Sequence, residues 1–286
     1  MKNILITLGC SHTEGYGCYD FNLLDSELNK LYQEFKLNKD STKTFSQIFR
    51  ENYQIQKKYN YFVDLNRDRF HERGWPVKLA KLLKFDKVIN FGVGSGSNAG
   101  QVKRFFEFDF YQNHKFKNSK VFLVWMLTEP TRTALYIGNQ LRDMMGPADK
   151  IWDSYFREIS KDNRDPLDDS ILELVFYYKI IENICKSNGW NFLCINGPSS
   201  DSLKIDSMLR EKNLDFLPFG YYELEFRENR SDFCGHMNEN GYDLFSHKIY
   251  QYIISKPEYS NIIGTNEGNI ENDWLGLWLY SKPKDI

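Results

Sequence analysis

The sequence predicts an α/β protein: a three-layer α/β/α sandwich around a mostly parallel, flavodoxin-like sheet, with insertions. Short apolar runs, each bounded by polar or glycine-bearing segments, have the character of parallel strands that are buried on both faces. Amphipathic helical patterns separate these runs. Such an alternation of strands and helices favours a parallel sheet with a helical layer on each face and right-handed crossovers.

The individual elements are predicted from the periodicity of apolar residues and from the glycines and prolines that begin or end helices. The expected strands are four apolar runs, residues 4–8, 88–91, 121–126 and 190–195. The expected helices lie between and after them, at residues 76–83, 101–108, 168–187 and 244–254. Pro76 suits the first turn of its helix, and Gly189 stands just past the end of the longest one, as helix stop signals do.

The chain of 286 residues is long enough for one large α/β domain, which we assign to residues 1–255. Two segments, at about residues 19–73 and 140–166, do not fit the compact unit and are predicted insertions. The first has helical patterns of its own, and the second is polar with scattered aromatic residues, which predicts a cap over the sheet end. The tail, residues 256–286, ends in an apolar aromatic stretch and is predicted to pack on the domain or on a partner.

Charge and cysteine content argue against several classes of protein. Lys and Arg total 37 against 39 acidic residues, so no nucleic-acid partner is expected. Five irregularly spaced cysteines predict reduced thiols and no secreted disulfide framework. The first apolar stretch is too short for a signal peptide, and no window approaches the roughly 18 apolar residues of a membrane span. A cytoplasmic protein without a membrane partner is therefore expected.

A serine follows the first predicted strand directly. Residues 9–15 read GCSHTEG, so Ser11 stands between glycines where a buried strand should turn out toward solvent. A serine held at such a turn can project its hydroxyl from the sheet end, where a nucleophile is useful. The plainer alternative is a tight turn in which Ser11 or Thr13 caps the next helix.

Two distant segments favour the interpretation of Ser11 as a nucleophile. Residues 90–98, NFGVGSGSN, follow the second predicted strand. Residues 232–242, DFCGHMNENGY, place His236 in a polar loop just before the last helix. Ligands of parallel α/β sheets bind at the carboxyl ends of the strands, where Ser11 and the glycine-rich loop would emerge.

These three segments, in this order, resemble the nucleophile, glycine and Asp/His blocks of the SGNH (GDSL-type) hydrolases. Residues 73–76, RGWP, and 125–132, WMLTEPTR, also resemble segments of the phage-type members. The likeness spans residues 4–254. It implies the SGNH fold and a serine esterase whose substrates are often O-acetyl groups on carbohydrate. It also points to a phage or viral protein that is either cytoplasmic or associated with a virion.

The resemblance assigns catalytic roles to Ser11, His236 and Asp232. Serine needs a base within hydrogen-bond reach, and His236 is the histidine whose loop could return over the sheet end. The family usually places its aspartate three positions before the histidine, but that position is Phe233 here, and Asp232 lies four before. Asp215 or a backbone carbonyl could orient the imidazole instead.

Acyl transfer also needs donors aimed at the developing oxyanion. The expected donors are the backbone N–H of Ser11 and that of Ser95 or Gly96, which match the glycine block. The family's third donor is an asparagine, and the matching strand end here offers Thr128 and Glu129. The Thr128 hydroxyl can donate, whereas an ionised Glu129 would repel the oxyanion.

Other roles are possible for several of these residues. Arg132 could bind an anionic group of the substrate or pair with Glu129. Cys234 and His236 are too few ligands for a metal site, and no metal or cofactor is expected. Ser97 stands where a dinucleotide-binding fingerprint requires its third glycine. The stronger rival is a catalytically inactive SGNH-like protein that binds glycans or forms part of a homo-oligomer or virion assembly.

Overall fold

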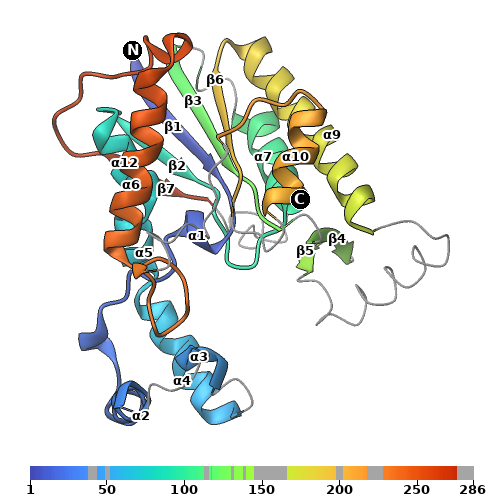
Figure 1. The fold of residues 1–286 in the computed structure, drawn as a ribbon. Coiled ribbons are helices and arrows are strands. Elements are labelled where there is room, and N and C mark those ends of the chain that lie inside the picture. The colour runs from blue at the N-terminus through green and yellow to red at the C-terminus, as the bar shows by residue number, and fades with distance from the viewer. Residues whose placement is uncertain are drawn as a thin grey trace.

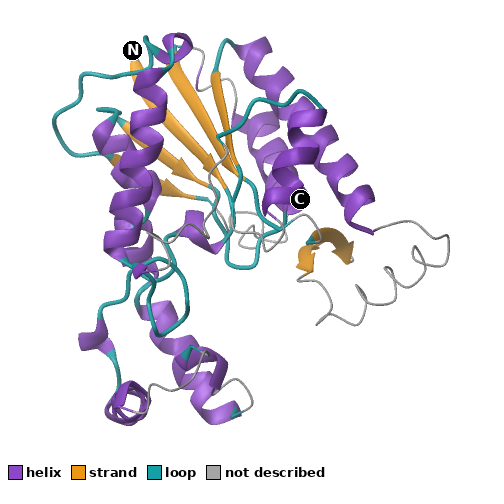
Figure 2. Cartoon of the chain, viewed as in Figure 1, coloured by secondary structure: helices purple, strands orange, loops and turns teal. Residues whose placement is uncertain are grey.

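The structure is a computed structural model that describes residues 1–37, 44–48, 52–112, 116, 118–129, 132–137, 140–144, 166–197, 202–217 and 228–275. Five parallel strands form one sheet in the order β6-β3-β1-β2-β7 (Figure 1). Their bounds are β1 (Lys2–Leu8), β2 (Lys87–Asn90), β3 (Ser119–Met126), β6 (Asn191–Ile195) and β7 (Glu271–Trp274). Helices flank both faces of this sheet (Figure 2), which confirms the predicted α/β/α architecture.

The central strand, β1, pairs in parallel with β2 on one side and β3 on the other. Its side chains alternate between the two faces, as a strand of period two requires. Leu5 packs into one buried cluster, whereas Ile4 and Ile6 pack into the other. Both faces of the strand are therefore buried, which explains its continuous apolar sequence.

Each face has its own helical layer (Figure 1). On one face lie α6 (Trp75–Leu82) and α12 (Glu239–Ser255), whose buried side chains share a cluster with Leu5. On the other lie α7 (Asn98–Gln112), α9 (Pro166–Asn188) and α10 (Ser202–Glu211), which pack around Ile4 and Ile6. The four helices predicted from periodicity are confirmed in type and place, with shifted ends.

The fifth strand, β7, was not predicted, because its sequence ENDW has no apolar run. It extends β2 at the edge of the sheet, where the Lys87 side chain pairs with Glu271 at 2.6 Å and with Asp273 at 2.5 Å. Polar side chains are tolerated there because an edge strand is not covered on all sides. Through β7, residues 271–274 pack on the domain itself, whereas most of the apolar aromatic stretch of the predicted tail, residues 276–280, lies outside the described residues.

The first insertion is helical, and it extends from the carboxyl end of the sheet (Figure 1). It contains the 3-10 turn η1 (Phe21–Leu23), α2 (Ser26–Leu37), α3 (Phe45–Ile48), α4 (Tyr53–Leu65) and α5 (Arg67–Arg73). Six of its aromatic rings surround the buried ring of Phe233: Tyr19, Phe21, Tyr32, Phe45, Tyr59 and Phe62. The insertion therefore shares a core with the loop that carries His236.

After β3 the chain forms an antiparallel hairpin of β4 (Thr133–Ile137) and β5 (Gln140–Met144). Most of the second predicted insertion, residues 145–165, lies outside the described residues. Within the described part of the chain, no helix has both the length and the apolar character needed to cross a bilayer.

Candidate active site

Ser11 stands at the carboxyl end of β1, as the first residue of the single helical turn α1 (Ser11–Glu14). The chain turns tightly here. A side chain at Gly9 would come within 1.8 Å of the Thr13 hydroxyl, and one at Gly92 within 2.3 Å of the Glu14 nitrogen. Gly15 closes the turn at φ +97°. Small residues at these positions let the loop after β2 lie directly against the nucleophile turn.

The Ser11 hydroxyl does not cap a helix. Its Oγ lies 2.7 Å from Nε2 of His236, a residue 225 positions away in the chain. Cys10 is the N-cap of α1 and makes no side-chain capping bond. Thus the structure brings together the serine and histidine predicted from the sequence, at the hydrogen-bond distance that proton transfer requires.

The loop that carries His236 is closed by its own backbone. The Ser231 N–H donates to the His236 carbonyl at 2.8 Å, and the Gly235 N–H donates to the Ser231 carbonyl at 2.7 Å. Gly235 has φ +78°, in the left-handed region that favours glycine. Gly17 passes beneath the loop, where a side chain would approach the Met237 carbonyl oxygen to 2.2 Å. Close packing between the loop of residues 231–237 and the segment at Gly17 therefore places the imidazole.

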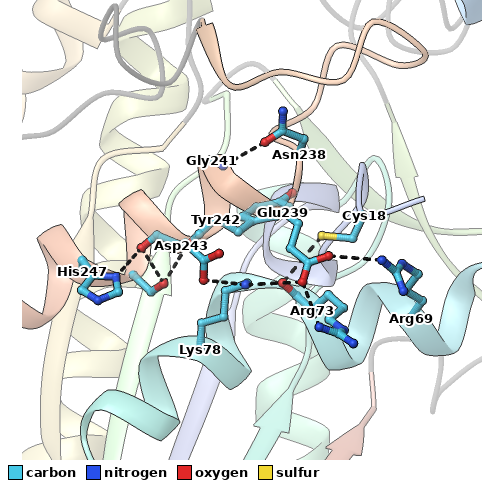
Figure 3. Close-up of polar contacts among 11 residues, drawn as sticks. Cys18, Arg69, Arg73, Lys78, Asn238, Glu239, Gly241, Tyr242, Asp243 and His247 are labelled. Carbon is cyan, nitrogen blue, oxygen red and sulfur yellow. Dashed lines mark hydrogen bonds and ion pairs between the residues drawn. The ribbon is translucent and has the colours of Figure 1, made fainter. Parts of the chain in front are cut away.

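Ion pairs anchor the helix that follows this loop (Figure 3). Glu239, at the start of α12, accepts from Arg69 at 3.2 Å and from Arg73 at 2.9 Å. Lys78 of α6 binds Asp243 at 2.5 Å. These contacts tie α12, three residues beyond His236, to α5 and α6.

Two aromatic rings pack against the His236 imidazole. The ring of His12 lies 4.5 Å from it, centroid to centroid, and that of Tyr16 lies 5.0 Å away. In the helical turn α1, Ser11 and its neighbour His12 both contact His236.

Burial lowers the pKa of His236 from 6.5 to about 4. The backbone carbonyl of Cys234 acts in the opposite direction, and the charges of Arg132 and Arg230 lower the pKa further. Burial also lowers the pKa of His12, with a second contribution from His236. The imidazole of His236 is therefore neutral near pH 7, the form that accepts a proton from serine.

The third predicted member of the triad, Asp232, lies elsewhere. It lines a separate cavity of about 320 Å³, whereas Ser11 and His236 line a larger cleft. Nδ1 of His236 is buried and has no hydrogen-bond partner among the described residues. Phe233 occupies the position where the family has its aspartate, and its ring is fully buried in the aromatic cluster of the first insertion. The backbone carbonyl of Cys234 favours the protonated ring without forming a hydrogen bond to Nδ1.

The loop after β2 brings one predicted oxyanion donor to the site. Ser95 lines the cleft and has φ +65°, uncommon for a residue other than glycine. Among the described residues, no acceptor engages the backbone N–H of Ser11 or of Ser95. The Gly96 N–H, by contrast, donates to the Val93 carbonyl at 2.9 Å. Of the two alternatives left open by the sequence, Ser95 has the available donor.

Thr128 lies just past the end of β3, and the side chain of Asn98 fixes its backbone. The Thr128 N–H donates to Oδ1 of Asn98 at 2.9 Å, and the Asn98 amide donates to the Thr128 carbonyl at 3.0 Å. The Thr128 hydroxyl is buried and forms no hydrogen bond with the described residues. Glu129 pairs with Arg132 at 3.8 Å, one of the two roles expected for that arginine.

The cleft has a volume of about 560 Å³ and is built from distant parts of the chain. Its lining residues are Ser11, Glu14, Tyr16, Asn60, Val63, Asp64, Arg67, Val93, Gly94, Ser95, His236 and Trp274. One wall, from Asn60 to Arg67, belongs to α4 and α5 of the first insertion, and Trp274 comes from β7. Sequence reasoning missed Glu14, Arg67 and Trp274, although Glu14 lies within the nucleophile motif.

Within the described residues, no group of three or more His, Cys, Asp or Glu side chains could hold a metal ion. The cleft brings together a serine, a neutral histidine and backbone donors, beside the polar side chains of its wall. No protein-family model and no curated protein matches the chain.

Proposed function

We propose that this protein is a serine hydrolase of the SGNH type, which cleaves an ester through an acyl-enzyme. One observation carries the proposal: Ser11 Oγ lies 2.7 Å from His236 Nε2 inside a cleft. A nucleophile in contact with a base that is neutral at pH 7 is the arrangement that activates a serine.

The reaction follows from the roles of these two groups. His236 takes the hydroxyl proton as Ser11 Oγ attacks the ester carbonyl carbon, and the carbonyl oxygen becomes an oxyanion near the Ser11 and Ser95 N–H groups. The C–O bond to the alcohol then breaks, and His236 gives its proton to the departing alkoxide oxygen. A water molecule repeats the sequence on the acyl-enzyme, releasing the acid and restoring Ser11.

The substrate we propose is an O-acetyl or similar acyl ester on a carbohydrate. Asn60, Asp64 and Arg67 form a polar wall beside the nucleophile, and such side chains bind hydroxyl groups well. The indole of Trp274 lines the same cleft, and aromatic rings pack against sugar rings. The resemblance to esterases of carbohydrates agrees with this composition.

A second candidate is a catalytically inactive SGNH-like protein that binds glycans or serves in a virion assembly. Two observations favour it. The imidazole of His236 lacks a carboxylate partner among the described residues, and the chain offers Thr128 and Glu129 where the family has its asparagine donor. The same cleft would then hold an ester or sugar without cleaving it.

Labelling with a fluorophosphonate probe separates the two candidates. An activated Ser11 forms a covalent adduct with the probe, so the parent protein should be labelled and Ser11→Ala should not. Ser207→Ala is the matched control, because Ser207 is exposed on α10 and bonds to Glu211 at 3.3 Å. If the parent takes up no label and hydrolyses no acetyl ester, the binding function replaces the enzymatic one.

A further inference from the structure

Glu14 is a buried acidic residue that the hydrolytic mechanism does not use. Only 3% of its surface is exposed, and it ends the helical turn that Ser11 begins. Its Oε2 accepts a hydrogen bond of 2.6 Å from the Gly94 N–H in the loop after β2. This contact joins the nucleophile turn directly to the loop that carries Ser95.

Cationic and aromatic side chains surround the other carboxylate oxygen. Oε1 lies 3.9 Å from Arg67 Nη1 and 4.0 Å from His71 Nε2. Both of these α5 residues contact Trp274: the His71 ring stacks on it at 4.2 Å, and the Arg67 guanidinium lies 5.5 Å from its centroid. The two carboxylate oxygens of Glu14 therefore have different neighbours: the Gly94 N–H for Oε2, and the Arg67 and His71 side chains for Oε1.

Trp274 holds the same loop at a second point. Its Nε1–H donates to the Gly92 carbonyl at 2.8 Å, two residues before the Gly94 N–H that Glu14 accepts. The Gly96 N–H then closes a turn onto the Val93 carbonyl at 2.9 Å. Between these bonds lies Ser95, whose backbone is in the left-handed region. A conformation that most side chains avoid persists when its surroundings fix it.

We propose that Glu14 is a positioning residue for the oxyanion site: its carboxylate fixes the loop at Gly94, so that the Ser95 N–H points to where the oxyanion forms. This inference rests on the proposed function. A donor contributes most to catalysis when it is oriented before the reaction, because no reorganisation is then needed as charge develops. Loss of the contact should therefore slow turnover more than it weakens substrate binding.

Two substitutions at Glu14 test the proposal. Glu14→Gln keeps an oxygen that can accept from Gly94, whereas Glu14→Met is of similar length and has no such oxygen. Hydrolysis of p-nitrophenyl acetate should lose about 10- to 1,000-fold in kcat in Glu14→Met, with KM within about twofold, and less than about tenfold in Glu14→Gln. Affinity for a boronic acid, which forms a tetrahedral adduct with serine, should fall in parallel with kcat/KM.

The control is Glu72→Gln, on the exposed side of α5, which should match the parent. If Glu14→Met keeps the parent kcat, or if both Glu14 variants lose kcat equally, the positioning role is overturned. Should Glu14→Met fail to fold, Glu14→Ala decides, because it too removes the oxygen that accepts from the Gly94 N–H. A kcat equal to the parent in that variant overturns the proposal.

Hydrogen exchange of residues 92–98 separates this inference from the proposed function. Exchange should be faster in Glu14→Met and unchanged in Glu14→Gln. An active, probe-labelled parent with no such differences refutes the inference alone. A parent that neither hydrolyses esters nor reacts with the probe refutes the hydrolase and the catalytic role of Glu14 together, and exchange then reports solely whether Glu14 holds the loop.

Discussion

Ser11 and His236 are positioned by different means. Ser11 lies within a turn of a few residues, where Gly9 and Gly92 allow the backbone to pack closely at the sheet end. His236 lies on a longer loop, which depends on the packing of Gly17 and on ion pairs of Glu239 with α5. The first arrangement follows largely from the local sequence GCSHTEG, with Gly92 as a close neighbour from a distant segment. The second depends on contacts between distant segments, so it is harder to predict and easier to alter by substitution.

The largest expected effect tests whether the two residues act as a unit. Ser11→Ala and His236→Ala should each lower kcat for p-nitrophenyl acetate by about 10⁴-fold or more, because loss of either member disables the same step. His247→Ala is the control for the histidine, since His247 is an exposed residue of α12. A Ser11→Ala protein that keeps most of the parent activity would contradict the assignment of the nucleophile.

The next effect concerns Thr128, whose hydroxyl is buried and forms no hydrogen bond with the described residues. If this hydroxyl is the third oxyanion donor, Thr128→Val should lower kcat by about 10- to 1,000-fold with little change in KM or in thermal stability. On the same assumption, Glu129→Gln should be neutral or beneficial, because it removes the negative charge next to Thr128 in the chain. A silent Thr128→Val together with an inactive Glu129→Gln would instead give Glu129 the essential role.

Local sequence predicted the parts of the fold that local sequence determines. The strands with apolar runs, the amphipathic helices and the Ser11 turn were all predicted correctly. Burial and the helical or strand period of apolar residues can be recognised in a short stretch of sequence. β7 was missed because its sequence, ENDW, has no strand pattern of its own, and the segment is extended because it pairs with β2. Glu14 and Trp274 were missed because their roles come from contacts with residues distant in sequence. Glu14 contacts Gly94, and Trp274 contacts Gly92.

The acid that orients His236 was the least predictable part, for a physical reason. A four-residue spacing to Asp232 brings two side chains together in a helical turn but not in other loops. The conformation here depends on Phe233, whose ring enters the aromatic cluster of the first insertion. Aromatic residues of the first insertion, far from the motif in sequence, thus decide where the Asp232 carboxylate lies.

The pH dependence of the rate reports the environment of the His236 loop. With the ordinary pKa of 6.5, activity would rise between about pH 5 and 8, as the sequence alone predicts. Because burial lowers the pKa of His236 to about 4, the base stays neutral above that value, and kcat/KM should be nearly flat from about pH 5 to 8 and fall below about pH 4. A midpoint near 6.5 would show that the imidazole is solvated in the working enzyme.

The same lowered pKa affects stability, with a defined sign. The unfolded chain takes up a proton on His236 near pH 6.5, whereas the folded protein does so at about 4. More protons are therefore bound to the unfolded state between these values, so the free energy of unfolding should decrease as the pH falls from about 6.5 to 4. Urea unfolding of the parent and of His236→Phe at several pH values should show a smaller decrease in the variant.

The smallest expected effect distinguishes the two ways of orienting the base. In a Ser-His-Asp triad, replacing the aspartate by asparagine lowers kcat by about 10⁴-fold, because the imidazole takes the wrong tautomer. Asp232 instead lines the separate cavity, and the Cys234 carbonyl favours the protonated imidazole. Asp232→Asn should therefore keep kcat within about threefold of the parent, with the control Asp206→Asn behaving alike. A loss near 10⁴-fold would mean that the loop rearranges during catalysis to bring the Asp232 carboxylate to Nδ1 of His236.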